Sequence, residues 1–166
     1  MGGSLGAQAL NEALRAALPR LLKTFDIIHL CGKGKVDEET AAPGYVQYEY
    51  IDREMPDLFA AADMVLSRAG ANAVFEFLAL RKPAVLVPLP MEASRGDQVL
   101  NAQYFERRGY ACMLDQAMIT PDVLAATVED VYAARITYVS AMQKETHADG
   151  TDAVLAVIRD AVKNHD

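Results

Sequence analysis

The sequence lacks two features that would each indicate a class of function. Its 166 residues contain no block of five or more like charges and carry a formal net charge of −7. Nucleic-acid binding needs a basic stripe, so we expect no nucleic-acid partner. Apolar runs stay shorter than the roughly 18 residues of a membrane-spanning helix. This excludes a membrane span and leaves membrane contact through a surface patch open.

Cysteine and histidine are also scarce. Cys31 and Cys112 end apolar, strand-like runs, with no CxxC motif and no signal-peptide pattern. We therefore expect buried, reduced thiols in a cytosolic protein. The three histidines are scattered, without metal-ligand spacing and without the order of a Ser–His–acid triad. The residues thus predict neither a metal nor another cofactor, and they offer no candidate general base.

What is present is an alternation of short apolar strands and helices. A chain that is 52% hydrophobic can form one compact domain, here residues 1–166. The pattern predicts a doubly wound, mostly parallel, Rossmann-like α/β sheet. At the start of one helix, Thr120 suits the N-cap and Pro121 the first position. Helices are expected at residues 7–23, 55–62, 71–80, 97–108, 121–135 and 151–162, and strands at 26–31, 45–51, 64–67, 84–88 and 110–114.

The start of the chain departs from this pattern. GGSLGA, residues 2–7, looks like a turn that follows a strand, yet only Met1 stands before it. We therefore expect a sheet that lacks its first strand. The chain has been cut, its start has been misassigned, or the protein is split at this point.

Two glycine turns are candidate anion sites. GGSLGA opens a helix, where unpaired N–H groups and the helix dipole favour a phosphate. It matches neither the dinucleotide nor the Walker fingerprint, so a simple tight turn is the alternative. SRAGAN, residues 67–72, repeats the geometry after a second strand. There Gly70 permits a positive φ or the close approach of a ligand. GKGK at 32–35 is interpreted as a loop.

Polar side chains lie near the same expected edge of the sheet. Glu76 follows SRAGAN among apolar neighbours, so it is solvated, paired or bound to ligand hydroxyls. In the segment 91–102, Asp97 is either the cap of the next helix or a ligand group. Gln98 and Asn101 are then surplus polar groups suited to the hydroxyls of a sugar. Ligands of open α/β sheets bind beyond the carboxyl ends of the strands. The two glycine turns and these polar side chains are therefore expected at one binding site.

Together these pieces resemble a known family. The matching stretches are GGSLGAQALNEAL, HLCGKGK, YIDREMPDLFAAADMVLSRAGANAVFEFLAL, KPAVLVPLP and SRGDQVLNAQYF, in the family's order and over nearly the whole chain. They resemble the C-terminal, donor-binding half of the MurG family, two-domain GT-B enzymes of glycosyltransferase family 28. These transfer N-acetylglucosamine from UDP-N-acetylglucosamine to lipid I, forming lipid II in peptidoglycan synthesis.

The resemblance implies a donor site without a cofactor. Glu76 would accept from the ribose hydroxyls, and Ile51 would face uracil with Met55 nearby. Asp97 and Gln98 would contact the N-acetylglucosamine hydroxyls, although many family members have His or Gln where this chain has Asp97. Ser4 would approach the phosphates from the other side. The donor diphosphate would lie on Ser67, Arg68, Ala69, Gly70, Ala71 and Asn72.

The resemblance also implies what this chain lacks. The family's N-terminal domain, with the acceptor site and the proposed base, is absent. We therefore expect UDP-N-acetylglucosamine binding with little transferase activity alone, at the inner face of the cell membrane. Lipid I would be an indirect partner, and an uncovered apolar face would allow a homo-oligomer.

Three alternatives stay open. One is a non-catalytic nucleotide-sugar-binding subunit with a separate acceptor-binding partner, as in the split dolichol-linked transferases of eukaryotes. Another is an enzyme similar to the UDP-N-acetylglucosamine 2-epimerases, which would need catalytic acids and a histidine in a second domain. The last is a stable α/β domain whose binding site is degraded.

Overall fold

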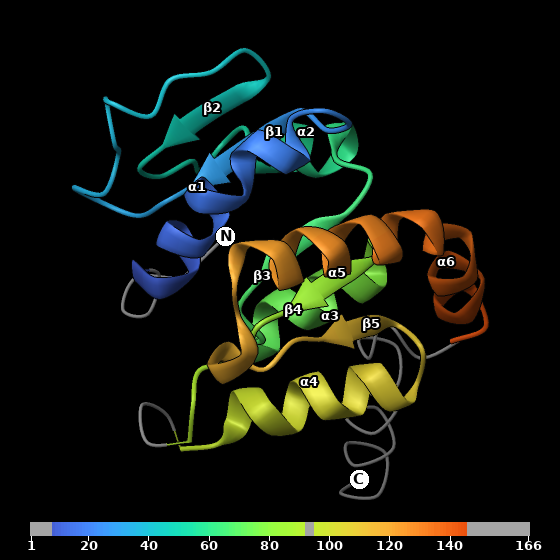
Figure 1. The fold of residues 1–166 in the computed structure, drawn as a ribbon. Coiled ribbons are helices and arrows are strands. Elements are labelled where there is room, and N and C mark those ends of the chain that lie inside the picture. The colour runs from blue at the N-terminus through green and yellow to red at the C-terminus, as the bar shows by residue number, and fades with distance from the viewer. Residues whose placement is uncertain (1–7, 92–94, 146–166) are drawn as a thin grey trace, which may run out of the picture.

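The computed structural model describes residues 8–91 and 95–145, and its strands form two parallel sheets. The smaller sheet pairs β1 (Ile27–Leu30) with β2 (Tyr45–Tyr48). The larger sheet has the order β3 (Val65–Ser67), β4 (Ala84–Leu86), β5 (Ala111–Met113), with both pairings parallel. The prediction of a parallel α/β fold is therefore confirmed (Figure 1).

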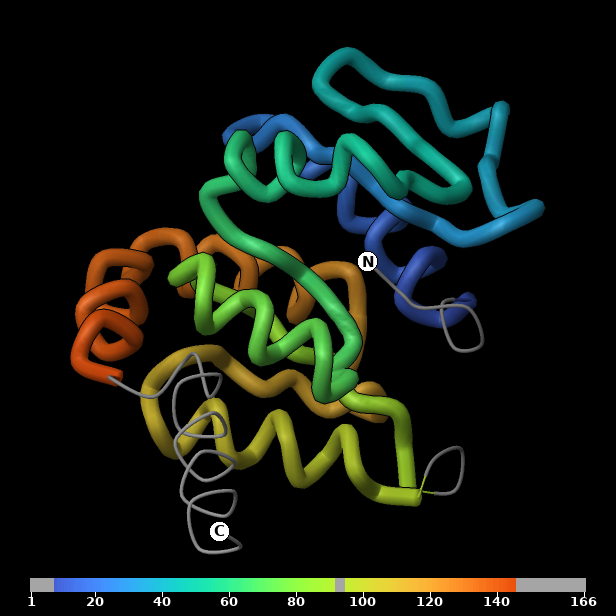
Figure 2. Tube along the Cα trace, turned by 180° about the vertical axis from the view of Figure 1, so that it is seen from behind, coloured from blue at the N-terminus to red at the C-terminus, as the bar shows by residue number. Residues whose placement is uncertain are grey.

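Helices cover both faces of these sheets. α1 (Gln8–Leu21) and α5 (Pro121–Ala133) pack on one face, and α5 stands in front of β4 in Figure 1. α2 (Met55–Ala61), α3 (Ala71–Ala79) and α4 (Asp97–Arg107) pack on the other, and α2 and α3 come to the front when the molecule is seen from behind in Figure 2. A short 3₁₀ helix, η1 (Gln116–Met118), precedes α5, and α6 (Arg135–Gln143) follows it.

The central strand β4 shows why helices are needed on both faces. Ala84 and Leu86 belong to the core under α2, α3 and α4, whereas Val85 and Val87 belong to the core under α1 and α5. Successive side chains of a strand point to opposite faces, so a strand that is apolar at every position needs cover on both. All three residues of β4 are buried.

The helix boundaries follow local chemistry. Thr120 Oγ1 accepts a hydrogen bond from the Val123 amide at 3.2 Å, and Pro121 is the first helical residue, which confirms the predicted start of α5. The sequence did not predict α6, because no glycine or proline marks the turn at Ala134 where α5 ends and α6 begins. The helix predicted at 151–162 lies outside the described residues.

Two burial predictions are corrected by the structure. The strand at 26–31 was expected to be buried, yet Ile28 is 43% exposed and only His29 of β1 is buried. The reason is that α1 covers one face of the β1–β2 pair, while Ile28 points to the other face. Both cysteines are free thiols; Cys31 is buried, but Cys112 is only half-buried.

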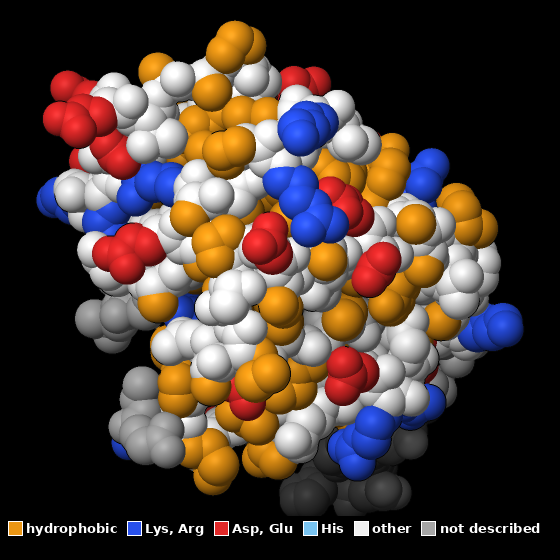
Figure 3. Space-filling model, in the orientation of Figure 1, with side chains coloured by type: hydrophobic (Ala, Val, Ile, Leu, Met, Phe, Trp, Pro, Cys, Tyr) orange, Lys and Arg blue, Asp and Glu red, His pale blue; other side chains and the backbone are white. Residues whose placement is uncertain are grey.

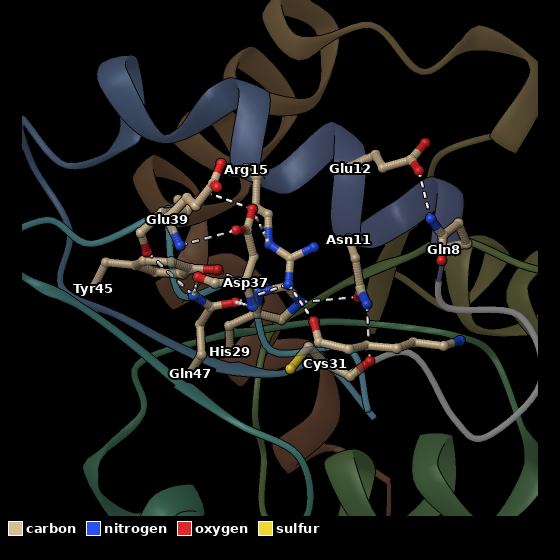
Figure 4. Close-up of polar contacts among 12 residues, drawn as sticks. Gln8, Asn11, Glu12, Arg15, His29, Cys31, Asp37, Glu39, Tyr45 and Gln47 are labelled. Atoms are coloured by element: carbon tan, nitrogen blue, oxygen red, sulfur yellow. Dashed lines mark hydrogen bonds and ion pairs between the residues drawn. The ribbon is translucent and has the colours of Figure 1, made fainter. Parts of the chain in front are cut away.

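A buried polar cluster ties α1 to the two strands (Figure 4). Asn11 Nδ2 donates to the Cys31 carbonyl at 2.8 Å, and Asn11 Oδ1 lies 2.9 Å from His29 Nε2. The other ring nitrogen, His29 Nδ1, lies 2.7 Å from the Tyr45 hydroxyl. Because Asn11 Oδ1 can only accept, His29 Nε2 donates and Nδ1 accepts. The neutral ring therefore satisfies both of its nitrogens inside the protein.

A second anchor from α1 fixes the loop between the strands. Arg15 Nη2 donates to the Lys35 carbonyl at 2.5 Å and to Gln47 Oε1 at 2.8 Å. Gln47 Nε2 in turn donates to the carbonyls of Asp37 and Thr40. The polar loop that follows β1 is thus held against β2 by side chains, in addition to the backbone bond from the Tyr45 amide to the Ala42 carbonyl.

The buried histidine predicts a pH dependence of stability. Burial lowers the pKa of His29 from 6.5 to about 4, so the unfolded chain binds a proton at mildly acidic pH that the folded chain does not. Stability from this group is complete above pH 6.5 and is lost as pH falls toward 4. Between pH 7 and 5 we expect a loss of about 2 kcal/mol in the free energy of unfolding, measured by urea denaturation.

The variant His29→Gln provides the control. Glutamine keeps a donor and an acceptor but does not titrate, so its unfolding free energy should change much less between pH 7 and 5. The hydrogen-bonded carboxylates of Asp37 and Glu129 have lowered pKa values, so their stabilisation is lost only at more acidic pH. Equal pH dependence in both proteins would contradict the assignment to His29.

Candidate functional site

The residues of SRAGAN lie at the carboxyl end of β3, where the chain passes from strand to helix. Ser67, Arg68 and Ala69 are buried, Gly70 is half-buried, and Ala71 and Asn72 are exposed. The segment therefore emerges from the core at Gly70. It reaches the surface at the first turn of α3.

Gly70 is not required by the fold of the chain itself. Its φ of −65° and ψ of 141° are accessible to any residue, so the first of the two alternatives, a positive φ, does not apply. A Cβ placed at Gly70 would have no other protein atom within 4 Å. The absent side chain leaves open space in front of the start of α3. Of the two reasons considered for a glycine here, close approach of a ligand is the one that this geometry permits.

The start of α3 offers unpaired backbone donors. Gly70 is the N-cap, and no side chain caps the helix. The first intrahelical bond runs from the Val74 amide to the Gly70 carbonyl, so the amides of residues 71–73 have no partner within the helix. By contrast, η1 and α5 are capped by Asp115 and Thr120. An open, uncapped helix start suits an anion.

Arg68 supports this turn from behind. Its side chain is 5% exposed, and Nη1 donates to the carbonyls of Val87 at 3.1 Å and Pro88 at 3.3 Å. Burial lowers the pKa of this guanidinium below its usual value. The residue thus joins the carboxyl end of β3 to the loop after β4, and its charge stays inside the protein rather than at the mouth of the site.

Gln98 and Asn101 of α4 are also engaged with backbone. Gln98 Oε1 accepts from the Leu89 amide at 3.1 Å, and Asn101 Nδ2 donates to the Ala69 carbonyl at 3.0 Å. Neither amide is surplus, because one group of each holds a loop of the site. The contact of Gln98 with a sugar, which its Nε2 group would make, stays a prediction. The contact of Asn101 with SRAGAN was missed. An amide side chain on the partly apolar α4 could have indicated a buried hydrogen bond. Its partner could not be inferred, because it is 32 residues away along the chain.

Asp97 is not the helix cap that one interpretation expected. The N-cap of α4 is Gly96, whose φ of 83° lies in the left-handed region that favours glycine. Asp97 is the first helical residue and is exposed. Its carboxylate therefore lies at the start of α4 and is accessible to a ligand.

Glu76 lies on the outer face of α3, with Asn72 one turn before it. Both are exposed. Its neighbour Phe75 is also 50% exposed, so Glu76 lies on a solvent-exposed face of α3, as the solvated alternative expected. Residues four apart share a helix face, which aligns Glu76 and Asn72 in one row from the open start of α3.

The remaining predicted residues come from elsewhere. Ile51 and Met55 follow β2, and Met55 begins α2 and packs on the core. Ser4 lies outside the described residues. A cavity of about 500 Å³ lies between β1 and β3, but among the predicted residues only Met55 lines it. This cavity is therefore not the space in front of SRAGAN.

The described surface of one face carries mixed charge. In Figure 3, acidic and basic side chains are interspersed, and no continuous basic stripe crosses the described part of this face. Of the described residues, none form a group of three or more side chains suited to hold a metal ion. No described helix is long and apolar enough to cross a membrane.

The parallel α/β fold, with its open turn between β3 and α3, matches a class of solved structures: one half of a GT-B glycosyltransferase fold. The crystal structure of Acinetobacter baumannii MurG matches with a TM-score of 0.79 at 30% identity, over 96% of this chain and 48% of that one. The glycotransferase of kitacinnamycin matches with a TM-score of 0.76 at 21% identity, over 96% of this chain and 41% of the other, which supports the fold alone.

The sequence comparison is more specific. Residues 1–154 match the glycosyltransferase family 28 C-terminal domain, and the chain belongs to that family. It is 49% identical to the UDP-N-acetylglucosamine--N-acetylmuramyl-(pentapeptide) pyrophosphoryl-undecaprenol N-acetylglucosamine transferase of Geobacillus thermodenitrificans and likewise to that of Lachnospira eligens. In both cases 98% of this chain is covered but 46% of the relative, so the chain spans about half the length of these curated relatives.

The contact between Asn101 and SRAGAN yields a test. Asn101→Ala leaves the Ala69 carbonyl without this donor, so we expect a loss of about 1–2 kcal/mol in the free energy of unfolding. The matched control is Gln103→Ala, an exposed position on the same helix, with an expected change within about 0.5 kcal/mol. Chemical denaturation measures both. Equal stability of the two variants would show that the contact is energetically unimportant.

Proposed function

We propose that this chain binds UDP-N-acetylglucosamine as the donor half of an inverting N-acetylglucosaminyltransferase that converts lipid I to lipid II. Membership of the family and the names of its relatives support the choice of substrate. The half-length match supports the restriction to the donor half. In this proposal the acceptor is bound by the other half of the enzyme.

One observation carries the proposal. Gly70 has an ordinary backbone conformation, and no protein atom occupies the place of its missing side chain. Directly behind it, α3 begins without a side-chain cap. A diphosphate placed there would accept hydrogen bonds from the first amides of α3 and meet the positive end of the helix dipole.

These groups would serve both binding and departure of the leaving group. Cleavage of the glycosidic bond to UDP leaves added negative charge on the diphosphate, and fixed N–H donors stabilise such charge. The donors are held in place because Arg68 and Asn101 fix the two sides of the SRAGAN turn. The exposed carboxylate of Asp97 would repel phosphate, which fits a contact with sugar hydroxyls instead.

The rest of the nucleotide would extend along the same edge. Glu76 lies in one row with Asn72 on the outside of α3, where a carboxylate can accept from the two ribose hydroxyls. In the proposal Ile51 and Met55 border the uracil, and Ser4 approaches the phosphates from the opposite side.

The base that activates the acceptor is assigned to the other half. His29 is the one histidine of the described residues, and both of its ring nitrogens are hydrogen-bonded inside the protein. The pKa of about 4 also keeps it neutral. The second candidate, a non-catalytic subunit with a separate acceptor-binding partner, shares this requirement. Recovery of such a partner by affinity purification would favour it.

The change Gly70→Ala tests whether the open space in front of the start of α3 binds a diphosphate. Its methyl group fits the backbone and meets no protein atom, so the free energy of unfolding should change by less than about 1 kcal/mol. The methyl group would, however, stand between α3 and a diphosphate. We expect UDP affinity, measured by calorimetry, to fall at least about tenfold, or about 1.4 kcal/mol.

Titration of three related ligands shows which part of the donor this chain recognises. UDP-N-acetylglucosamine, UDP and UDP-glucose are titrated into the wild-type chain, and binding of all three with a preference for the first supports the proposal. No UDP binding at millimolar concentration would refute donor binding by this chain. Unchanged UDP affinity of a folded Gly70→Ala protein would remove the start of α3 from the site.

The role of Glu76 is tested separately. Glu76→Ala removes the proposed acceptor of the ribose hydroxyls, and we expect a loss of about 1–3 kcal/mol in UDP binding free energy. The control is Asp130→Ala, an exposed carboxylate on α5, which packs on the opposite face. If calorimetry finds the same affinity for both variants, Glu76 does not contact the nucleotide.

A further inference from the structure

The outer side of α4 carries large apolar side chains that remain exposed. Leu100 is 65% exposed and Tyr104 is 39% exposed, and α4 forms the lower border of the described molecule in Figures 1 and 2. On the neighbouring helix α3, Phe75 is 50% exposed. The rings of Phe75 and Tyr104 both lie against Phe105, with centroids 5.6 Å and 5.9 Å from its ring. The exposed side chains therefore form one apolar surface across α3 and α4, and such surfaces mark contacts with another molecule.

Charged side chains flank the apolar ones along the same side of α4. Residues three, four or seven apart lie on one side of a helix, which places four exposed side chains in a row: Asp97, Leu100, Tyr104 and Arg107. Asp97 begins α4 and Arg107 ends it. Among the described residues, neither of these two takes part in an ion pair. The row thus has an acidic end, an apolar centre and a basic end.

This row is complementary to its own reversed copy. Asp97 and Arg107 lie equally far from Ala102 along the helix, and so do Leu100 and Tyr104. If a second copy of α4 lies antiparallel to the first, with a twofold axis level with Ala102, Asp97 faces Arg107 of the second copy. In the same arrangement Leu100 faces Tyr104. Each of these contacts occurs twice, as in every interface between identical surfaces.

We propose that the outer side of α4, together with Phe75, is the interface of a twofold dimer of this chain. The apolar side chains supply the attraction. The ion pairs fix the antiparallel register, because exposed ion pairs add little affinity but discriminate between arrangements. Arg108 supports the interface, since its guanidinium lies 5.5 Å over the Tyr104 ring and orders that ring. This inference does not depend on the proposed donor binding.

The distribution of charge favours a second copy over a lipid surface. An anionic membrane would attract Arg107, but it would repel Asp97 in the same row. A second copy satisfies both charges at once. The size of the surface indicates a weak dimer, because α4 is about 16 Å long and a surface only two helices wide is small for a specific interface.

Asp97 belongs both to this surface and to the candidate site. A carboxylate has two oxygens and several acceptor positions, so an ion pair with Arg107 of the second copy leaves capacity for a sugar hydroxyl. Dimer formation and sugar binding are therefore compatible at this residue. The dimer is measured without nucleotide, so its absence would leave the proposed donor binding untouched.

Exchange of the two charges tests the pairing. In Arg107→Glu and in Asp97→Arg, like charges would face each other at both ends of the interface. We expect the dissociation constant of the dimer to rise at least about tenfold in each. The double variant Asp97→Arg/Arg107→Glu restores opposite charges, so its dissociation constant should return to within about threefold of the wild type. Sedimentation equilibrium between roughly 10 μM and 1 mM measures the four proteins, and circular dichroism checks that each is folded.

The apolar centre is tested by Leu100→Glu. A charge placed against Tyr104 of the second copy has no partner, so the dissociation constant should again rise at least about tenfold. The matched control is Ile136→Glu on α6, where the side chain is 68% exposed and lies outside the proposed interface. This control should leave the dissociation constant within about twofold of the wild type.

Several results would contradict the proposed dimer. A wild-type chain that stays monomeric at roughly 1 mM has no such interface. Failure of the double variant to recover the dimer would exclude the antiparallel pairing, and equal effects of Leu100→Glu and Ile136→Glu would exclude this side of α4. If the monomeric wild type sediments with phosphatidylglycerol vesicles and Leu100→Glu does not, the surface binds lipid, and the proposal is likewise overturned.

Discussion

Parallel pairing of β3, β4 and β5 is the constraint on which the rest of this structure depends. Parallel strands must be connected by crossovers, so helices accumulate on both faces and every strand has to be apolar on both sides. β4 meets this demand with Ala84, Val85 and Leu86, all buried. The same pairing sends all carboxyl ends to one edge. The turns after β3 and β4 therefore become neighbours without any further specification in the sequence.

At that edge side chains hold the turns in place, whereas backbone amides are left to bind a ligand. Arg68, Gln98 and Asn101 all form hydrogen bonds to main-chain groups of the adjacent turns. The amides at the start of α3 remain for a ligand, because Gly70 has no side chain that could cap or cover them. A binding surface made of backbone dipoles is rigid when such anchors surround it. Polar side chains at this edge therefore also support the turns that carry the backbone donors.

The sequence predicted the fold well because its signals are local. Hydrophobic runs, the Thr120 cap and the glycine after β3 each act within a few residues, and the five strands and most helices were located from them. Three features that the sequence left unpredicted or open depend instead on contacts between distant residues. The exposure of Ile28 depends on which helix covers β1, and the partner of Asn101 is far along the chain. The choice between the two alternatives for Gly70 depends on how the turn packs. Motif resemblance named the candidate site residues, but only coordinates could divide buried supports such as Arg68 from exposed groups such as Glu76.

The division into two sheets also has a consequence for cooperativity. The β1–β2 unit is joined to the rest chiefly through α1, where Arg20 forms a two-point ion pair with Glu129 of α5 and Phe25 packs edge-on against Tyr132. The two sheets are therefore coupled by side chains, through the core that α1 shares with β4 and α5, and not by a ladder of backbone hydrogen bonds. Loss of packing at this joint would uncouple the two sheets, whereas the intact joint lets the chain unfold with one free energy of unfolding.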